Sequence, residues 1–200
     1  LAAAGGAEDQ HELLVGDVAG AFDMAVTTAI CALFGSFSNS VGTTTVDLSV
    51  DDFMAAIFQL EQSNVNSRPI AVLAPVQVSD LQSSLRQEGG PLQYIAATQE
   101  MISAKGQGFV GSFAGVDIFK SSKVATSTGR QGGMFVRGAI GYASGVAPMD
   151  AGLDGFIQSN GPVSIEFERT NGAYTTVYGQ AYFGVAEIQD SMGVLIETDA

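Results

Sequence analysis

Three glycines have the spacing of a motif that binds dinucleotides. Gly106, Gly108 and Gly111 form the pattern G-x-G-x-x-G within the stretch "AKGQGFVGSFAGVDIFKSSKV". The motif binds a pyrophosphate only where it follows a strand and opens a helix. Here a helical pattern precedes the glycines, and a strand pattern around Val116 and Ile118 follows them. The sequence therefore predicts turns and a hairpin at these glycines, and no cofactor site.

No other group of side chains predicts a catalytic centre. His11 lies in the polar first turns of a predicted helix, where a solvated role is favoured over a catalytic one. Asp51 and Asp52 could bind a hard cation or exchange protons, but acidic residues also stabilise a helix N-terminus, which is the favoured explanation. Cys31 is predicted to be a buried, unreactive thiol, since no basic residue lies nearby. We therefore expect that the chain is not an enzyme and that it binds no metal or cofactor.

The charge balance disfavours nucleic acid and anionic membranes as partners. The chain has 21 acidic and 8 basic residues and a net charge of −13, which repels phosphate backbones. An acidic coat that keeps the protein soluble is the favoured explanation; a surface that avoids sticking to nearby DNA is the alternative. The basic residues are scattered along the chain, which also disfavours a nucleic-acid site. They include Arg68, Lys105, Lys120, Lys123, Arg130, Arg137 and Arg169.

The segment Val18–Phe34 is apolar and has about the minimum length that spans a membrane. Asp23 interrupts it, and no Lys or Arg flanks it to set an orientation. The sequence therefore predicts a helix buried among protein. The first ten residues have neither the basic region nor the long apolar region of a signal peptide.

Helices are predicted in the first part of the chain. Residues 8–35 form one long helix with apolar residues at three- and four-residue steps. Ser49 and Asp52 resemble a capping box at the start of a second helix, with Asp in place of the usual Glu. The apolar stripes of the two helices are Leu14, Val18, Phe22, Val26, Ile30 and Leu33, and Phe53, Ile57 and Leu60.

The middle of the chain mixes a short strand with further helices. Ile70–Leu73 is a short, partly β-branched apolar run, which predicts a buried strand ended by Pro75. Ser79 is predicted to cap a third helix over residues 80–87. Residues 92–104 are helical by pattern.

The last part of the chain is rich in strand signals. The Asn171–Gly172 pair is a strong signal for a hairpin turn, and Val194–Ile196 is predicted to be a last short strand. The order of the predicted elements indicates the α+β class: helices come first, mixed elements follow, and a long hairpin comes last. Glu166 and Glu168 share one face of the first hairpin strand, which predicts either a solvated face or basic partners on another chain. That strand alternates Val163, Ile165 and Phe167 with Ser164, Glu166 and Glu168.

Four stretches together resemble one known family. A long helix, "EDQHELLVGDVAGAFDMAVTTAICALF", precedes a glycine-containing loop, and "LSVDDFMAAIFQLEQSNVNSRPIAVLAPVQVSDL" gives a helix, a strand ending in Pro and a helix start. "GFVGSFAGVDIFKSSKV" has Gly111, Gly115, Val116, Ile118 and Ser121 in a Gly-x-x-x-Gly-(Val/Ile)-x-(Val/Ile)-x-x-Ser pattern. The long hairpin and "GVLIETDA" follow. This order resembles the major capsid proteins of tailed bacteriophages, which have the Hong Kong 97 phage-type fold.

The resemblance implies a division of the chain. Residues 1–45 would form the spine helix and the start of a peripheral domain, 46–161 a mixed α/β axial domain, 162–185 the peripheral-domain β-hairpin, and 186–200 a closing strand that returns to the axial domain. Family members usually have an N-terminal arm and an extended loop before the spine helix, and only seven residues precede it here. Those parts are either missing from this sequence or reduced, so the crosslinking chemistry of some relatives is not transferred. The absent initiator methionine fits prohead proteolysis and truncation equally.

The resemblance implies a structural function. Many copies would form hexamers and pentamers that close an icosahedral head around double-stranded DNA, without binding a specific DNA sequence. The shell would assemble in the bacterial cytoplasm and form the virion surface, with portal, scaffolding or decoration proteins as further partners. Large apolar interfaces would stabilise it.

Three surfaces are predicted to contact other copies. The loop Ser144–Gly161, with Asp150 and Asp154, would lie near the capsomer axis. The hairpin tip at Asn171 and Gly172 would reach neighbouring capsomers. Glu166 and Glu168 would pair with basic residues of an adjacent subunit.

Two alternatives remain open at this point. The same fold forms encapsulin-like nanocompartments, which enclose proteins, and the nature of the cargo would distinguish them. An enzyme or small-molecule binder would instead be a monomer stabilised by its ligand.

Overall fold

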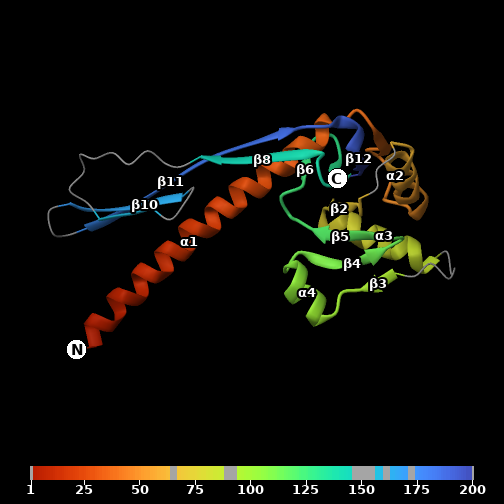
Figure 1. Cartoon of the computed structure of the whole chain (residues 1–200). Helices are drawn as coiled ribbons and strands as arrows, with labels where there is room; N and C mark the ends of the chain where they lie inside the picture. The colour runs from red at the N-terminus through yellow and green to blue at the C-terminus, as the bar shows by residue number, and fades with distance from the viewer. Residues whose placement is uncertain are drawn as a thin grey trace. The chain divides into compact units, whose positions relative to one another are not determined.

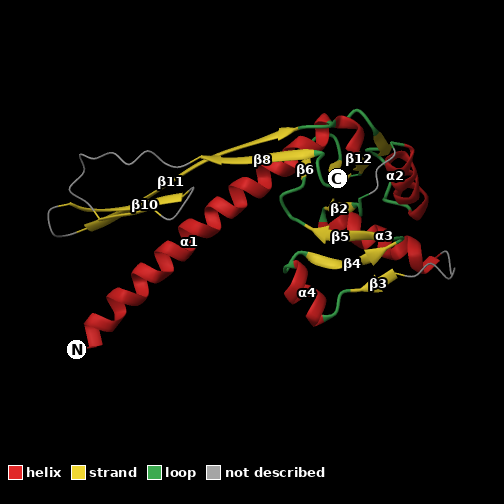
Figure 2. Ribbon diagram, viewed as in Figure 1, coloured by secondary structure: helices red, strands yellow, loops and turns green. Residues whose placement is uncertain are grey.

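The computed structural model contains two compact units (Figure 1). One unit comprises Leu1–Val26 and Tyr142–Val185, and the other comprises Thr27–Gly141 and Ala186–Ala200. Helices and strands are interspersed in the element order, which confirms the α+β class (Figure 2). The structure describes residues 2–63, 67–87, 94–145, 156–159, 163–170 and 174–199, with side chains at 15–63, 67–87, 94–145 and 179–199.

The long N-terminal helix is confirmed. Helix α1 is Ala2–Ala32, and a short 3-10 helix, Leu33–Ser36, follows it. The segment Val15–Ser36 is long and apolar enough to cross a membrane, with a mean hydropathy of 1.7, but only 11% of its apolar window is buried. The prediction of a helix buried among protein is therefore wrong for most of its length. Burial in this segment is concentrated at Cys31 and Phe34, which belong to a core cluster of the larger unit.

The larger unit is built on a mixed sheet of eight strands. The pairs β1–β12 and β2–β5 are parallel, and the other pairs along the sheet are antiparallel. The short strand β6 pairs only with β7. The order across the sheet is β1 (Ser40–Gly42), β12 (Gly193–Thr198), β7 (Arg130–Phe135), β2 (Ile70–Leu73), β5 (Val116–Lys120), β4 (Phe109–Phe113) and β3 (Tyr94–Ala96), with β6 at Ala125–Thr126.

Both faces of this sheet are covered, so its central strands are apolar on both sides. Successive side chains of a strand point to opposite faces. Val194 and Ile196 of β12 therefore join a core cluster with helices α2 (Val50–Gln62) and α3 (Pro75–Gln87), whereas Leu195 joins a second cluster with Phe34. The predicted strands at Ile70–Leu73 and Val194–Ile196 are confirmed. The predicted cap of α2 is also confirmed.

Two predicted helices differ from the structure. Helix α3 begins at Pro75, not after Ser79, because proline fits the first turn of a helix, where its missing N–H costs nothing. Residues 92–104 are not one helix: strand β3 is followed by helix α4, Gln99–Lys105, whose first turn is capped by the Thr98 hydroxyl. Pairing of β3 with β4 overrides the helical pattern of the sequence.

The smaller unit contains the predicted hairpin. Strand β10 (Val163–Thr170) pairs antiparallel with β11 (Tyr174–Glu187), from Val163 opposite Ala181 to Thr170 opposite Tyr174. Four strands form its sheet in the order β8-β11-β10-β9, with β8 at Ile140–Gly145 and β9 at Phe156–Ser159. The stretch 144–161 is therefore not all loop, because β10 has a second edge and β9 pairs with it.

Candidate functional site

The three glycines of the opening motif serve a turn and a strand, as predicted. Gly106 ends α4, and β4 follows it, so no helix begins after the glycines. Gly111 lies in β4 where β3 passes: a Cβ atom there would lie 2.5 Å from the Ile95 carbonyl oxygen and 2.8 Å from the Tyr94 hydroxyl. The geometry for a pyrophosphate on a helix N-terminus is therefore absent at this motif.

The turn after β4 has a demanding backbone conformation. Ala114 and Gly115 both have positive φ, at 48° and 82°. Two positive φ values at the centre of a two-residue hairpin are typical of a type I′ turn, which joins β4 to β5 with the twist that the strands require. This turn places Asp117 of β5 in register opposite Ser112 of β4.

Asp117 is a buried carboxylate with two basic partners that the sequence pattern did not indicate. Its Oδ1 accepts a hydrogen bond from Arg68 and its Oδ2 accepts one from Lys105, both at 2.7 Å. The Asp117 side chain is 12% exposed, whereas Arg68 is 57% exposed and Lys105 31%. The Lys105 ammonium also lies 4.6 Å from the centre of the Phe109 ring. The cluster joins the segment before β2, the end of α4 and strand β5, and its three charged side chains are paired with one another.

Three carboxylates form an acidic cluster: Asp47 precedes α2, Asp80 lies within α3 and Asp199 follows β12. One oxygen each of Asp47, Asp80 and Asp199 lie within 4.8 Å of one another. Burial raises the pKa of Asp80, and the charges of Asp47 and Asp199 raise it further. Carboxylate oxygens are ligands that Ca²⁺ and Mg²⁺ prefer, so among the described residues these three could hold a hard cation. Exposed acidic groups are also commonly found close together without a bound cation.

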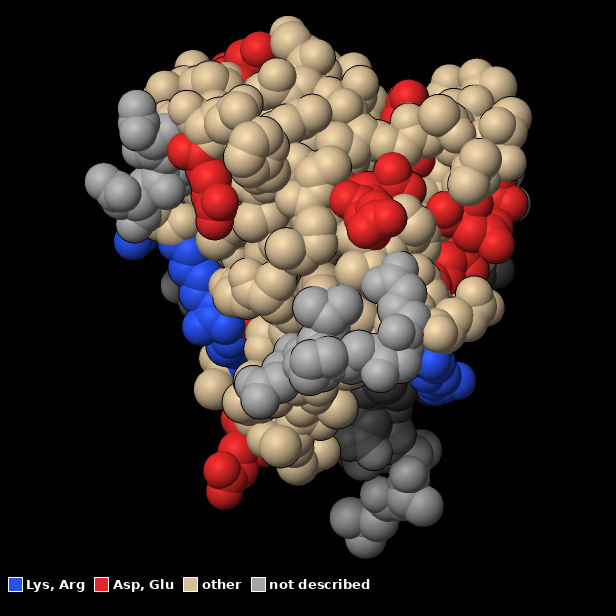
Figure 3. All heavy atoms as spheres, turned by 90° about the vertical axis from the view of Figure 1, so that its right-hand side faces the viewer, with Lys and Arg blue, Asp and Glu red and all other residues tan. Residues whose placement is uncertain are grey.

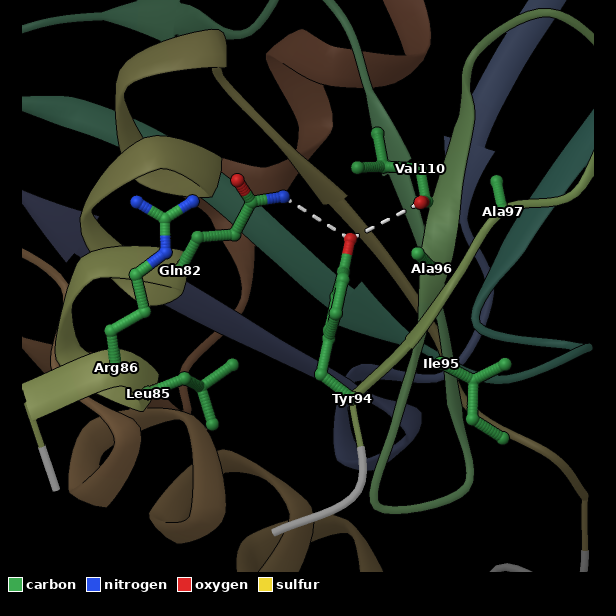
Figure 4. A pocket seen from close by; sticks show the side chains of 8 residues that line it. All are labelled: Gln82, Leu85, Arg86, Tyr94, Ile95, Ala96, Ala97 and Val110. Atoms are coloured by element: carbon green, nitrogen blue, oxygen red, sulfur yellow. Dashed lines mark hydrogen bonds between the residues drawn. The ribbon is translucent and has the colours of Figure 1, made fainter. Parts of the chain in front are cut away.

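A pocket of about 680 Å³ lies between α3 and β3 (Figure 4). Tyr94 points into it: its hydroxyl accepts a hydrogen bond from Gln82 at 3.2 Å and donates one to the Val110 carbonyl at 3.1 Å. Among the described lining residues, Arg86 is the charged one, and none of them forms an acid–base pair or is a nucleophile. The described lining, named here the α3–β3 pocket, is Gln82, Leu85, Arg86, Tyr94, Ile95, Ala96, Ala97 and Val110.

Among the candidate catalytic residues of the sequence, Asp52 and Cys31 are not in the described lining of this pocket. Asp52 exchanges hydrogen bonds with Ser49 at the start of α2, as expected for a helix cap. Cys31 is buried, and burial raises the pKa of its thiol, so the unreactive form predicted from the sequence is favoured. His11 is in α1, in a stretch where only the backbone is described.

The predicted contact residues fall mostly outside the described part of the chain. Asp150, Asp154, Asn171 and Gly172 lie outside the described residues. For Glu166 and Glu168 the backbone alone is described: in β10 they are paired with Tyr178 and Thr176 of β11.

One face of the chain is mostly uncharged (Figure 3). In that view Asp and Glu form separate patches, and Lys and Arg lie toward the edges. Such a surface differs from the continuous basic stripe of a nucleic-acid site.

Comparisons with known proteins identify solved structures with a similar fold, but no family of similar sequence. No model of a known protein family matches the sequence, and no curated protein matches it. Among solved structures, the chain is similar to one from Mycobacterium phage Che8, with 14% identity, a TM-score of 0.59, and coverage of 89% of this chain and 60% of the other. It is also similar to the capsid of cyanophage P-SCSP1u, with 13% identity, a TM-score of 0.60, and coverage of 96% and 66%.

An encapsulin has a comparable similarity. The holo-SrpI encapsulin complex from Synechococcus elongatus matches with 16% identity, a TM-score of 0.56, and coverage of 80% of this chain and 52% of the other. The chain thus spans between half and two thirds of the length of the structures it matches. The resemblance inferred from the sequence is confirmed at the level of fold. The chain has the Hong Kong 97 phage-type fold of tailed-phage major capsid proteins, which it shares with an encapsulin.

Proposed function

We propose that the chain is the major capsid protein of a tailed double-stranded DNA phage. The supporting observation is the similarity to the P-SCSP1u capsid over 96% of this chain, because it takes in nearly every element and not one motif. Copies would form hexamers and pentamers of an icosahedral head through head-to-tail contacts that close into rings. The role is structural and not catalytic.

Further partners follow from this function. The shell would assemble in the host cytoplasm with portal, scaffolding or decoration proteins. It would enclose DNA without sequence-specific binding, and the net charge of −13 would keep its surface from holding the DNA tightly.

A second candidate is the shell subunit of an encapsulin-like nanocompartment. The similarity to the SrpI encapsulin favours it almost as strongly, with a TM-score of 0.56 against 0.60 for the phage capsid. The two functions differ in what the shell encloses. Fold alone does not separate them.

The contact surfaces and the domain roles are part of the proposal. Residues 46–161 would be the axial domain, of which the part up to Gly141 lies in the larger compact unit and the part from Tyr142 in the smaller one. Asp150 and Asp154 would lie near the capsomer axis. The β10–β11 hairpin would be peripheral, with Asn171 and Gly172 at a contact between capsomers. Glu166 and Glu168 would pair with basic residues of an adjacent subunit, which the antiparallel register of β10 would hold in a fixed line.

The deciding experiment is particle mass and negative-stain imaging of the native full-length protein, followed by nuclease treatment. Closed shells of uniform diameter that protect DNA would support the phage capsid. Uniform shells that retain protein cargo would support the nanocompartment. A monomer or dimer from the full-length protein would overturn both.

A further inference from the structure

Helix α2 presents an apolar stripe away from the core. Met54 and Phe58 are one helical turn apart and are 40% and 59% exposed. The helical period places Asp51 and Glu61 on the same side, and both are exposed. These four residues are named the α2 ridge. The opposite side of the helix is buried in the core, at Phe53, Ala56, Ile57 and Leu60.

The α3–β3 pocket has the complementary character. Leu85 and Val110 give it apolar walls, and Arg86 gives it a positive charge. Arg86 is exposed, so the charged part of the wall is accessible to a partner. No residue of the α2 ridge is among the described lining, so the ridge and the pocket are separate surfaces of one chain.

We propose that the α2 ridge of one copy docks into the α3–β3 pocket of a second copy. This inference rests on the proposed assembly into shells. Phe58 enters among the apolar walls, and Glu61 pairs with Arg86. The cavity of about 680 Å³ is within the range of pockets that bury most of an organic ligand, so it has room for an aromatic side chain. Aromatic anchors in such pockets commonly dominate the energy of an interface.

Charge favours a second copy as the occupant. Each copy has a net charge of −13, so most pairs of surfaces repel. An arginine that faces the acidic ridge of the next copy reverses that repulsion at one place. Because the ridge and the pocket are different surfaces, the contact is heterologous and can repeat around a ring.

The test compares assembly of full-length variants with the wild type, by mass photometry over a range of subunit concentrations. Phe58→Ser should raise the concentration needed for assembly by at least about tenfold, the effect of losing an interface anchor. Val46→Ser is the matched control, since Val46 is also exposed, at 55%, and lies outside the ridge; it should assemble as the wild type does. Thermal melting of the unassembled subunits checks that both variants fold.

Charge reversal gives an independent arm. Arg86→Glu and Glu61→Arg should each weaken assembly, since each places like charges together, and the double variant should restore it. The ridge–pocket contact would be overturned, and the shell function would stand, if the wild type assembles and Phe58→Ser assembles at the same concentration. The same conclusion would follow if the double variant assembles no better than the single charge variants. Failure of the wild type to assemble would overturn the proposed function itself.

Discussion

Asp117 and Asp80 show how the environment gives one residue type two roles. Asp117 lies between Arg68 and Lys105 and forms an ion pair with each of them. Asp80 lies instead beside Asp47 and Asp199, and burial together with these charges raises its pKa. The ion pairs of Asp117 therefore stabilise the folded state, whereas the ionised form of Asp80 destabilises it.

Asp80→Asn should stabilise the protein at neutral pH. A raised pKa means that the folded state binds the Asp80 proton more tightly than the unfolded state does, so this group lowers stability as the pH rises through its folded pKa. The gain should be full at pH 7 and vanish below about pH 4, where the unfolded carboxyl is also protonated. Urea unfolding of unassembled subunits at several pH values measures it.

Asp117→Asn is the matched control, because it makes the same chemical change where two cations are present. It should lower the free energy of unfolding by about 1–3 kcal/mol at neutral pH, the usual loss of a charge-assisted hydrogen bond. Equal effects of the two substitutions, in sign and size, would contradict the assignment of opposite environments.

At the scale of elements, the start of α3 is fixed to the sheet by one amide. Gln77 is fully buried, and its Oε1 accepts a hydrogen bond from the Ala74 N–H at 2.9 Å. Its Nε2 lies within hydrogen-bonding distance of the carbonyl oxygens of Arg130 and Ile196 and of the Thr198 hydroxyl, at 3.1–3.3 Å. The side chain therefore joins a helix to two strands, β7 and β12, that are distant in the sequence.

Gln77→Leu should cost about 2–3 kcal/mol of folding free energy, because it leaves buried donors and acceptors unpaired. Gln82→Leu makes the same change on the same helix but removes a single hydrogen bond at a partly exposed position, so it should cost less than about 1 kcal/mol. Chemical denaturation of the two variants side by side gives the comparison. A loss for Gln77→Leu no larger than that for Gln82→Leu would show that the buried amide does not fix α3.

At the scale of the whole molecule, the hairpin of the smaller unit carries one of the proposed contacts between capsomers. In the smaller unit, Thr170 and Tyr174 are the last described pair of the β10–β11 hairpin before residues 171–173. Its proposed role places Asn171 and Gly172 at a contact between capsomers.

Replacing Asn171 and Gly172 together by alanine should weaken the shell without unfolding the subunit. We expect earlier dissociation in denaturant, by an amount equivalent to about 1 kcal/mol for each of the two positions. Light scattering of assembled particles follows the dissociation. Ser122→Ala, at an exposed turn of the larger unit, is the control and should leave the shell unchanged. Normal assembly with unchanged shell stability would remove the hairpin tip from the interface.

The sequence alone determined the elements whose signals are local. Ser49 and Asp52 cap α2, Ile70–Leu73 is a buried strand, and the alternation from Val163 predicted β10, because caps and periodicity depend on residues only a few positions apart. The order of four such stretches was enough to indicate the fold.

Only the tertiary structure decided which distant residues meet. Arg68 and Asp117 are 49 positions apart, and nothing local pairs them; the parallel pairing of β2 with β5 does. The acidic cluster likewise joins residues that are distant in the sequence, and β3 is a strand because it pairs with the edge of β4. The exposure of α1 also depends on the tertiary structure, since burial depends on what packs against a helix and not on its own hydropathy. Periodicity describes one element at a time, whereas chain reversals and sheet order fix the neighbours of each residue.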